Sequence, residues 1–307
     1  MKTFFKNSNS GLVTSDKWEK NCWISIENPT AQDRNYLLHE LQIPEAFYND
    51  IGDIDERPRI ETENGWYLII LRIPYKNADS KLPFTTVPLG IVFKDDIFVS
   101  ICFHETGMLN DFVPYTQRKN VTIKNHFDLV LRLMLSSCVW FLKYLKQINQ
   151  RIKLAEDNLE KSVKNEELQT LLQLEKCLVY FITSLKGNNV LFQRINNIKS
   201  ENFDLDLLED VDIELKQAQE MSKIYSDILS GMMDAYASVI SNNLNVVMKR
   251  LTSISIILMI PTLIASLYGM NVPNSLENNP NGLMIIVLIS IVLTTFGVFL
   301  FKKKNFF

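Results

Sequence analysis

The distribution of apolar residues divides this chain into a long mixed part and a short, very apolar part. Two uncharged runs, Leu251–Met270 and Leu283–Phe301, lie close to the C-terminus. At about 1.5 Å per residue in a helix, each run spans roughly 30 Å, the thickness of a bilayer's hydrocarbon core. The polar residues 271–282 between them include two prolines. The pattern therefore predicts two membrane-spanning helices joined by a short loop.

The first 125 residues alternate between apolar runs and turn residues. Strands are predicted at Cys22–Ile26, Arg59–Thr62, Trp66–Ile73, Leu89–Phe93 and Ile97–Cys102, and a helix at Thr30–Leu41. Asn64-Gly65 and Lys94-Asp95-Asp96 predict hairpin turns between strands. This part is therefore expected to be an α/β domain.

From His126 the apolar residues recur at steps of three and four, which predicts helices. One is expected from about Glu166 to Lys186, ended by Gly187. Because no proline occurs from Asp210 to Ile260, a single long stalk helix is predicted to continue into the first span. The expected organisation is an α+β, α/β/α-like domain over 1–125, a helical part over 126–250, spans at 251–270 and 283–301, an outer loop at 271–282 and a basic tail at 302–307.

Charge gives the expected orientation. The first 250 residues hold 29 Lys and Arg against 34 Asp and Glu, because Lys302–Lys304 and Glu277 account for the rest of the 32 and 35. Lys249 and Arg250 precede the first span, Lys302–Lys304 follow the second, and the loop holds neither lysine nor arginine. The positive-inside rule then places both termini in the cytoplasm, at the plasma (inner) membrane.

No signal peptide is predicted, and the four scattered cysteines are expected to be reduced. An acidic soluble part argues against a nucleic-acid partner.

Polar and flexible residues form a heptad stripe along the first span and the helix before it. The steps are 3, 4, 3, 4, 3, 4 and 3, and the residues are Asn245, Met248, Thr252, Ser255, Met259, Thr262, Ser266 and Gly269. One interpretation is helix packing through small residues. The other is a water-filled lumen, which requires an oligomer because two helices cannot enclose a pore.

At its end the first span reads Tyr268-Gly269-Met270-Asn271, followed by a second span and terminal lysines. This arrangement resembles the CorA-type magnesium transporters. Further segments look familial: Glu56–Glu61, Leu174–Lys176, Phe181–Leu185, Asn245–Lys249 and Pro261–Ser266. The resemblance therefore covers most of the chain.

The resemblance implies a homopentamer that passes Mg²⁺, and also Co²⁺ and Ni²⁺, down its gradient. Gly269, Met270 and Asn271 would form the selectivity filter, with the Asn271 amide as its outer ring. The stripe would line the pore, and Met259, Leu251 and the adjacent Met248 would form hydrophobic gates. Ser266 stands where some relatives have glycine. Of the family's Met-Pro-Glu-Leu outer loop only Glu277 matches, within Asn274-Ser275-Leu276-Glu277.

Magnesium chemistry agrees with this assignment. Mg²⁺ gives up its water reluctantly, so neutral amide and carbonyl oxygens suit a filter for the hydrated ion. The membrane potential supplies about 2.3 kcal/mol per charge per 100 mV, and no phosphate-binding loop for a nucleotide is present. No resident cofactor is expected.

Two alternatives remain: a zinc-transporting relative, in which the motif's methionine is commonly isoleucine, and a membrane-anchored cytoplasmic sensor or scaffold. An enzyme is not predicted.

Residues 201–220 hold eight acids against one lysine, Lys216. This stretch is either a solvated helix face or a cation sensor. In the family a regulatory magnesium site lies between neighbouring cytoplasmic domains, and the matching acid falls at Asp210, beside Glu209, Asp212 and Glu214. Asp79 of an adjacent subunit is the expected partner.

Overall fold

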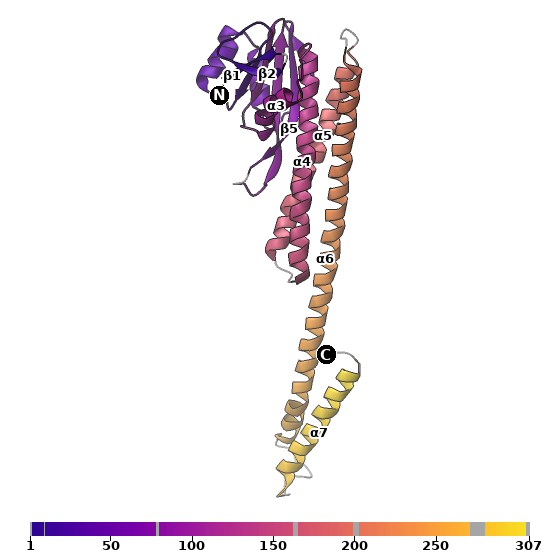
Figure 1. Ribbon diagram of the computed structural model, residues 1–307. Helices are drawn as coiled ribbons and strands as arrows, with labels where there is room; N and C mark the ends of the chain where they lie inside the picture. The colour runs from indigo at the N-terminus through magenta and orange to yellow at the C-terminus, as the bar shows by residue number, and fades with distance from the viewer. Residues whose placement is uncertain are drawn as a thin grey trace. The chain divides into compact units, whose positions relative to one another are not determined.

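The computed structural model describes residues 2–8, 10–77, 80–161, 165–198, 203–270 and 280–304. These divide into two compact units, Met1–Met232 and Met233–Phe307. Figure 1 shows the elements of each unit. The first unit contains a mixed sheet and helices, including the first part of a 64-residue helix, and the second contains the rest of that helix and a C-terminal helix.

The sheet of the first unit has seven strands in the order β2-β1-β3-β7-β6-β5-β4. Their bounds are β1 Lys2–Ser8, β2 Gly11–Ser15, β3 Trp23–Glu27, β4 Arg59–Glu63, β5 Trp66–Lys76, β6 Phe84–Lys94 and β7 Ile97–Cys102. Only the β3–β7 pair is parallel. The β4–β5 hairpin turns at Asn64 and Gly65, whose φ angles of 52° and 81° fit the left-handed turn that this dipeptide favours.

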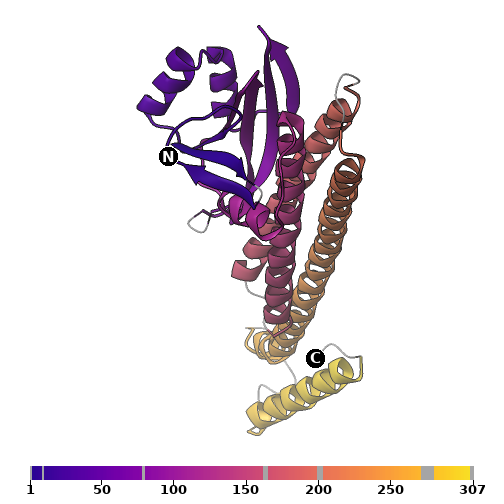
Figure 2. The ribbon, with the colours of Figure 1, turned by 45° about the horizontal axis from the view of Figure 1, so that its top comes forward.

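Helices cover both faces of this sheet (Figure 2). On one face, α1 Ala31–Asn35, the π-helical turn η1 Tyr36–Glu40 and α2 Glu45–Gly52 lie over a core that includes Ile24, Leu37, Ile51, Leu68 and Val99. On the other lie α3 Gly107–Arg118, α4 His126–Lys161 and α5 Asn165–Asn196. The predicted α/β/α-like architecture is therefore confirmed. The predicted helix over 30–41 is correct in extent but changes from α to π pitch at Tyr36.

The predicted end of α5 at Gly187 is wrong, since the helix continues to Asn196. Gly187 serves close packing instead. A Cβ at this position would lie 2.8 Å from Cγ and 2.9 Å from Cδ of Pro58. The helix continues because Leu191, Phe192 and Ile195 extend its buried face.

Polar contacts also tie α5 to the sheet. Asn188 forms two hydrogen bonds with the backbone of Arg72 in β5: it accepts from the amide at 3.0 Å and donates to the carbonyl at 2.7 Å. The buried Arg72 guanidinium donates to the carbonyls of Ile54 and Thr86. These contacts fix the 53–58 loop, which precedes β4, against the sheet.

The long helix α6 runs from Leu205 to Tyr268, which confirms the predicted stalk helix and its continuation into the first apolar run. It contains Pro261. The last helix, α7, runs from Gly282 to Lys303. Both are long and apolar enough to cross a membrane. All four cysteines are buried and unbridged, as predicted. Burial raises the pKa of Cys102 and of Cys138 to about 12, so both are protonated thiols at neutral pH.

Candidate functional site

The second unit is an antiparallel hairpin of the last part of α6 and α7. Ser253, Ile257 and Ile264 form the buried face of α6 in this unit, with exposed fractions of 1%, 9% and 8%. A Cβ at Gly297 of α7 would lie 3.1 Å from Cδ1 of Ile260. The glycine thus allows the two helices to approach closely, and α7 covers this face of α6.

The predicted stripe lies on the opposite face of α6. At 3.6 residues per turn, Met259 lies about 200° around the helix from Ile257. Met259 is 66% exposed and Leu251 57% exposed. Every residue of the stripe is exposed: Asn245, Met248, Thr252, Ser255, Met259, Thr262, Ser266 and Gly269. A membrane helix therefore presents its polar residues on the side that its own partner helix leaves uncovered.

Two hydroxyl groups of the stripe have an orientation that is fixed by a hydrogen bond to the helix backbone. Ser255 donates to the carbonyl of Leu251 at 2.9 Å, and Thr262 donates to that of Leu258 at 3.1 Å. Each hydroxyl proton is thus committed to the helix backbone. The oxygen lone pairs remain as acceptors on the exposed face, which suits a ligand that donates hydrogen bonds.

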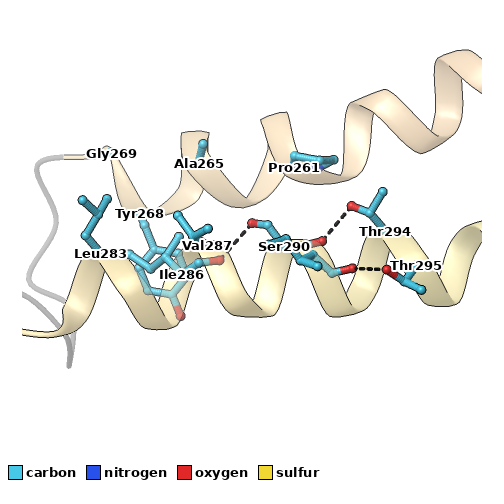
Figure 3. Close-up of a pocket in the computed structure, with 11 residues that line it drawn as sticks. Pro261, Ala265, Tyr268, Gly269, Leu283, Ile286, Val287, Ser290, Thr294 and Thr295 are labelled. Atoms are coloured by element: carbon cyan, nitrogen blue, oxygen red, sulfur yellow. Dashed lines mark hydrogen bonds between the residues drawn. The ribbon is translucent and has the colours of Figure 1, made fainter.

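A groove of about 670 Å³ lies between the two helices beside their contact (Figure 3). Pro261, Ala265 and Tyr268 of α6 and Leu283, Ile286 and Val287 of α7 are among its lining residues. The hydroxyls on its α7 side, Ser290, Thr294 and Thr295, donate to carbonyls one turn earlier in α7. The groove is thus mainly apolar, and of the stripe residues only Gly269 lines it.

The predicted filter is described only in part. Gly269 follows α6 and donates its amide to the Ala265 carbonyl at 2.9 Å, which prolongs the helical pattern to the start of the motif. Met270 is exposed. Asn271 and Glu277 lie outside the described residues.

From Asp206 onward the acidic stretch lies in the first turns of α6, in the first unit. Asp212 pairs with Lys216 at 2.6 Å. Asp210 and Glu214, one turn apart, line a cavity of about 270 Å³ together with Asp111 of α3, and in the described part of the chain neither has an ion-pair partner. Asp111 pairs with Arg118 at 3.3 Å. Asp79 lies outside the described residues.

Within the residues that the structure describes, no group of three or more His, Cys, Asp or Glu could hold a metal ion. Sequence reasoning found Asp210 and Glu214 but not Asp111, because the helix that carries Asp111 contains Pro114 and was not predicted.

The fold and the stripe together define a two-span membrane protein with a large α/β/α domain and a polar face on its first span. The sequence profile of the CorA-like Mg²⁺ transporter proteins matches residues 18–303. The chain belongs to this family. The match also confirms the prediction that the chain is not an enzyme.

Two curated relatives are cobalt/magnesium transport proteins CorA. The protein of Methanocaldococcus jannaschii is 27% identical over 92% of this chain and 90% of the relative. The protein of Thermotoga maritima is 27% identical over 92% of this chain and 82% of the relative.

Solved structures show the same fold. The complete structure of the CorA magnesium transporter from Methanocaldococcus jannaschii matches with a TM-score of 0.83 at 23% identity, over 100% of this chain and 99% of that one. The ZntB cytoplasmic domain from Vibrio parahaemolyticus matches with a TM-score of 0.61 at 12% identity, over 79% of this chain and 97% of that domain.

Proposed function

We propose that this protein is a channel for Mg²⁺, and also for Co²⁺ and Ni²⁺, that carries the ion into the cell down its electrochemical gradient. Five copies would place their α6 stripes around one axis, with both termini in the cytoplasm. The family and the names of the two curated relatives support Mg²⁺ and Co²⁺ transport. The observation that carries the pore is the exposed stripe on α6, opposite the face that α7 covers.

The stripe suits a hydrated cation. Water molecules bound to Mg²⁺ point their hydrogens outward, so the hydrated ion is a hydrogen-bond donor and Mg²⁺ keeps that water. Ser255 and Thr262 offer acceptor oxygens, because their protons are bonded to the backbone. Neutral oxygens bind such an ion weakly enough to release it. At the mouth, Gly269, Met270 and Asn271 would form the filter, and Glu277 would attract cations to the loop.

Hydrophobic side chains interrupt this polar path. Met248, Leu251 and Met259 are each more than half exposed, in the first apolar run of α6 or on the turn before it. Around a common axis they would form rings that expel water and so close the pore to ions.

Intracellular Mg²⁺ would regulate the channel through Asp210. Asp212 is neutralised by Lys216, whereas Asp210 and Glu214 face a cavity with Asp111 and keep their charge available. An acid of the neighbouring subunit, Asp79 in our prediction, would complete the site. Mg²⁺ would bridge carboxylates that otherwise repel one another, and so hold the closed state when the cell is replete.

Zinc transport is the second candidate. The match to a ZntB cytoplasmic domain concerns the fold alone, at 12% identity. Met270 favours magnesium. A membrane-anchored sensor is the third candidate, but an anchor gives no reason for a polar stripe through the depth of a bilayer.

Ion flux into liposomes that contain the purified protein tests the proposal. We expect Mg²⁺ influx that an inside-negative potential accelerates. A parallel assay with Zn²⁺ tests the second candidate. Asn271→Ala is expected to abolish Mg²⁺ influx while the protein still assembles. Full influx through assembled Asn271→Ala would exclude the filter, and absence of influx through the wild type would exclude the function.

A further inference from the structure

Five basic residues gather at one end of the hairpin: Lys249, Arg250, Lys302, Lys303 and Lys304. The antiparallel course follows from two contacts, Gly297 beside Ile260 and, towards the other end, Leu283 in the same groove as Tyr268. Counting at about 1.5 Å per residue, Lys249 and Arg250 lie roughly 15 Å beyond Ile260, and the three lysines roughly 7–11 Å beyond Gly297 in the same direction. All five thus fall within a layer about 10 Å thick.

Two of these cations continue, by heptad spacing, the lines of residues along which the two helices pack. Arg250 precedes the buried Ile257 by one heptad, and Lys304 follows Gly297 by one heptad. Residues seven apart share a helix face. Counted at helical spacing, Arg250 and Lys304 therefore lie at the same end of the hairpin, on the sides along which the two spans pack.

Among the described residues of the second unit, no acid compensates this charge. In the described part of the chain, none of the five side chains takes part in an ion pair, and all five residues are exposed. The unit has two acids, Asp234 and Glu277. Asp234 lies fifteen residues, or about 22 Å of helix, before Lys249. Glu277 lies outside the described residues.

We propose that this basic cluster binds the phosphate of an anionic phospholipid headgroup. The cluster begins where the uncharged runs end, which is the level of the headgroups, and the exposed Leu300 of α7 continues from it as a surface for acyl chains. A headgroup phosphate among these basic side chains relieves their mutual repulsion. A soluble phosphate supplies the charge but gains nothing from the apolar surface. The proposal rests on the hairpin's crossing a bilayer and not on ion flux.

The test measures lipid selectivity of the full-length protein in phosphatidylcholine bilayers that contain trace spin-labelled lipids. We expect labelled phosphatidylglycerol to associate with the protein more strongly than labelled phosphatidylcholine. The variant Lys302→Gln/Lys303→Gln/Lys304→Gln should lose roughly fivefold in selectivity for each charge that contacts the phosphate. Replacement of the same three lysines by arginine should retain it. As a matched control, Lys146→Gln/Lys153→Gln/Lys176→Gln removes three exposed charges from α4 and α5.

Three outcomes would overturn the proposal. They are equal association of the two lipids with the wild type, unchanged selectivity in the glutamine variant, and an equal loss in the control variant. Excess inorganic phosphate at constant ionic strength separates the two phosphate sources: if it displaces the labelled phosphatidylglycerol, the cluster is a general anion site and not a lipid site. Because no ion flux is measured, failure here leaves the proposed channel function standing.

Discussion

At the scale of single residues, Met259 and Leu251 stand out because the structure leaves large apolar side chains exposed on the stripe side of α6. Replacing Met259 by Ser, or Leu251 by Asn, puts a polar group into the proposed constriction, so that water can wet it. We expect greater Mg²⁺ flux at high internal Mg²⁺ than in the wild type. Liposome flux measurements check this, with Leu288→Ser, at an exposed position of α7, as the control. An unchanged closed-state flux in both variants would contradict the gate.

A second residue-scale effect concerns Glu27, at the end of β3. Burial raises the pKa of its carboxyl group, and the negative charge of Glu105 adds to the rise, while the Thr106 amide, which donates to it at 2.9 Å, acts in the opposite direction. A raised pKa in the folded state means that stability is highest below the ordinary pKa of about 4.3 and falls as pH rises through the folded-state value.

Glu27→Gln should remove this dependence, because the amide oxygen still accepts from Thr106 but carries no charge. We therefore expect the variant to unfold at a higher temperature than the wild type at pH 7, with the difference shrinking toward pH 4. Thermal unfolding of the detergent-solubilised protein at several pH values measures it. The exposed Glu63→Gln serves as control, and a variant whose stability runs parallel to the wild type across this range would show that Glu27 is not the cause.

At the scale of elements, the packing of α5 on the 53–58 loop depends on the absence of a side chain at Gly187. Gly187→Ala places a methyl group 2.8 Å from a ring carbon of Pro58, so the loop or the helix must shift. We expect a loss of about 1–3 kcal/mol in the free energy of unfolding.

Gly231→Ala is the matched control for Gly187→Ala. It lies inside α6 with nothing within 4 Å of the added methyl group, and alanine there should stabilise the helix by up to about 1 kcal/mol. Denaturant unfolding of both variants tests the pair. Equal behaviour of the two glycines would mean that close packing against Pro58 is not what Gly187 provides.

Elements with a strong pattern could be predicted from the sequence, and the others could not. The hairpin at Asn64-Gly65, the strand at Ile97–Cys102 and the long α6 follow from turn chemistry, apolar runs and the absence of proline. β1 and β2 were missed because their residues are largely polar and only partly buried, and α2 and α3 because they are short, α3 with a proline inside. The end of α5 was misplaced because glycine signals both a helix stop and a close contact.

The candidate site was predictable to the extent that it lies on one helix. The stripe of α6 is a heptad pattern, so its shared face could be read from spacing alone, and the structure adds which face α7 covers. The cavity that joins Asp210 and Glu214 to Asp111 required the tertiary fold, because Asp111 is about a hundred residues away in the chain.

At the scale of the whole molecule, the proposed pentamer makes Asp210 a test of regulation. Asp210 is exposed, has no ion-pair partner in the described part of the chain, and shares a cavity with Glu214 and Asp111. Asp212, two residues later, is paired with Lys216 at 2.6 Å. Asp210→Asn and Asp212→Asn each remove one negative charge from the same helix, so any difference between these two variants reports on position and not on net charge.

We expect Mg²⁺ to protect the purified wild-type protein from proteolysis, because a metal bridge between subunits restrains the separation that exposes cleavage sites. Asp210→Lys should require much higher Mg²⁺ for the same protection, since a lysine replaces a ligand and repels the ion. Asp210→Asn, which keeps a neutral oxygen, should fall between. Asp212→Asn should resemble the wild type. If Asp210→Lys and the wild type are protected at the same Mg²⁺ concentration, Asp210 is not part of a sensor, and the acidic stretch of α6 acts only as a solvated surface that concentrates cations.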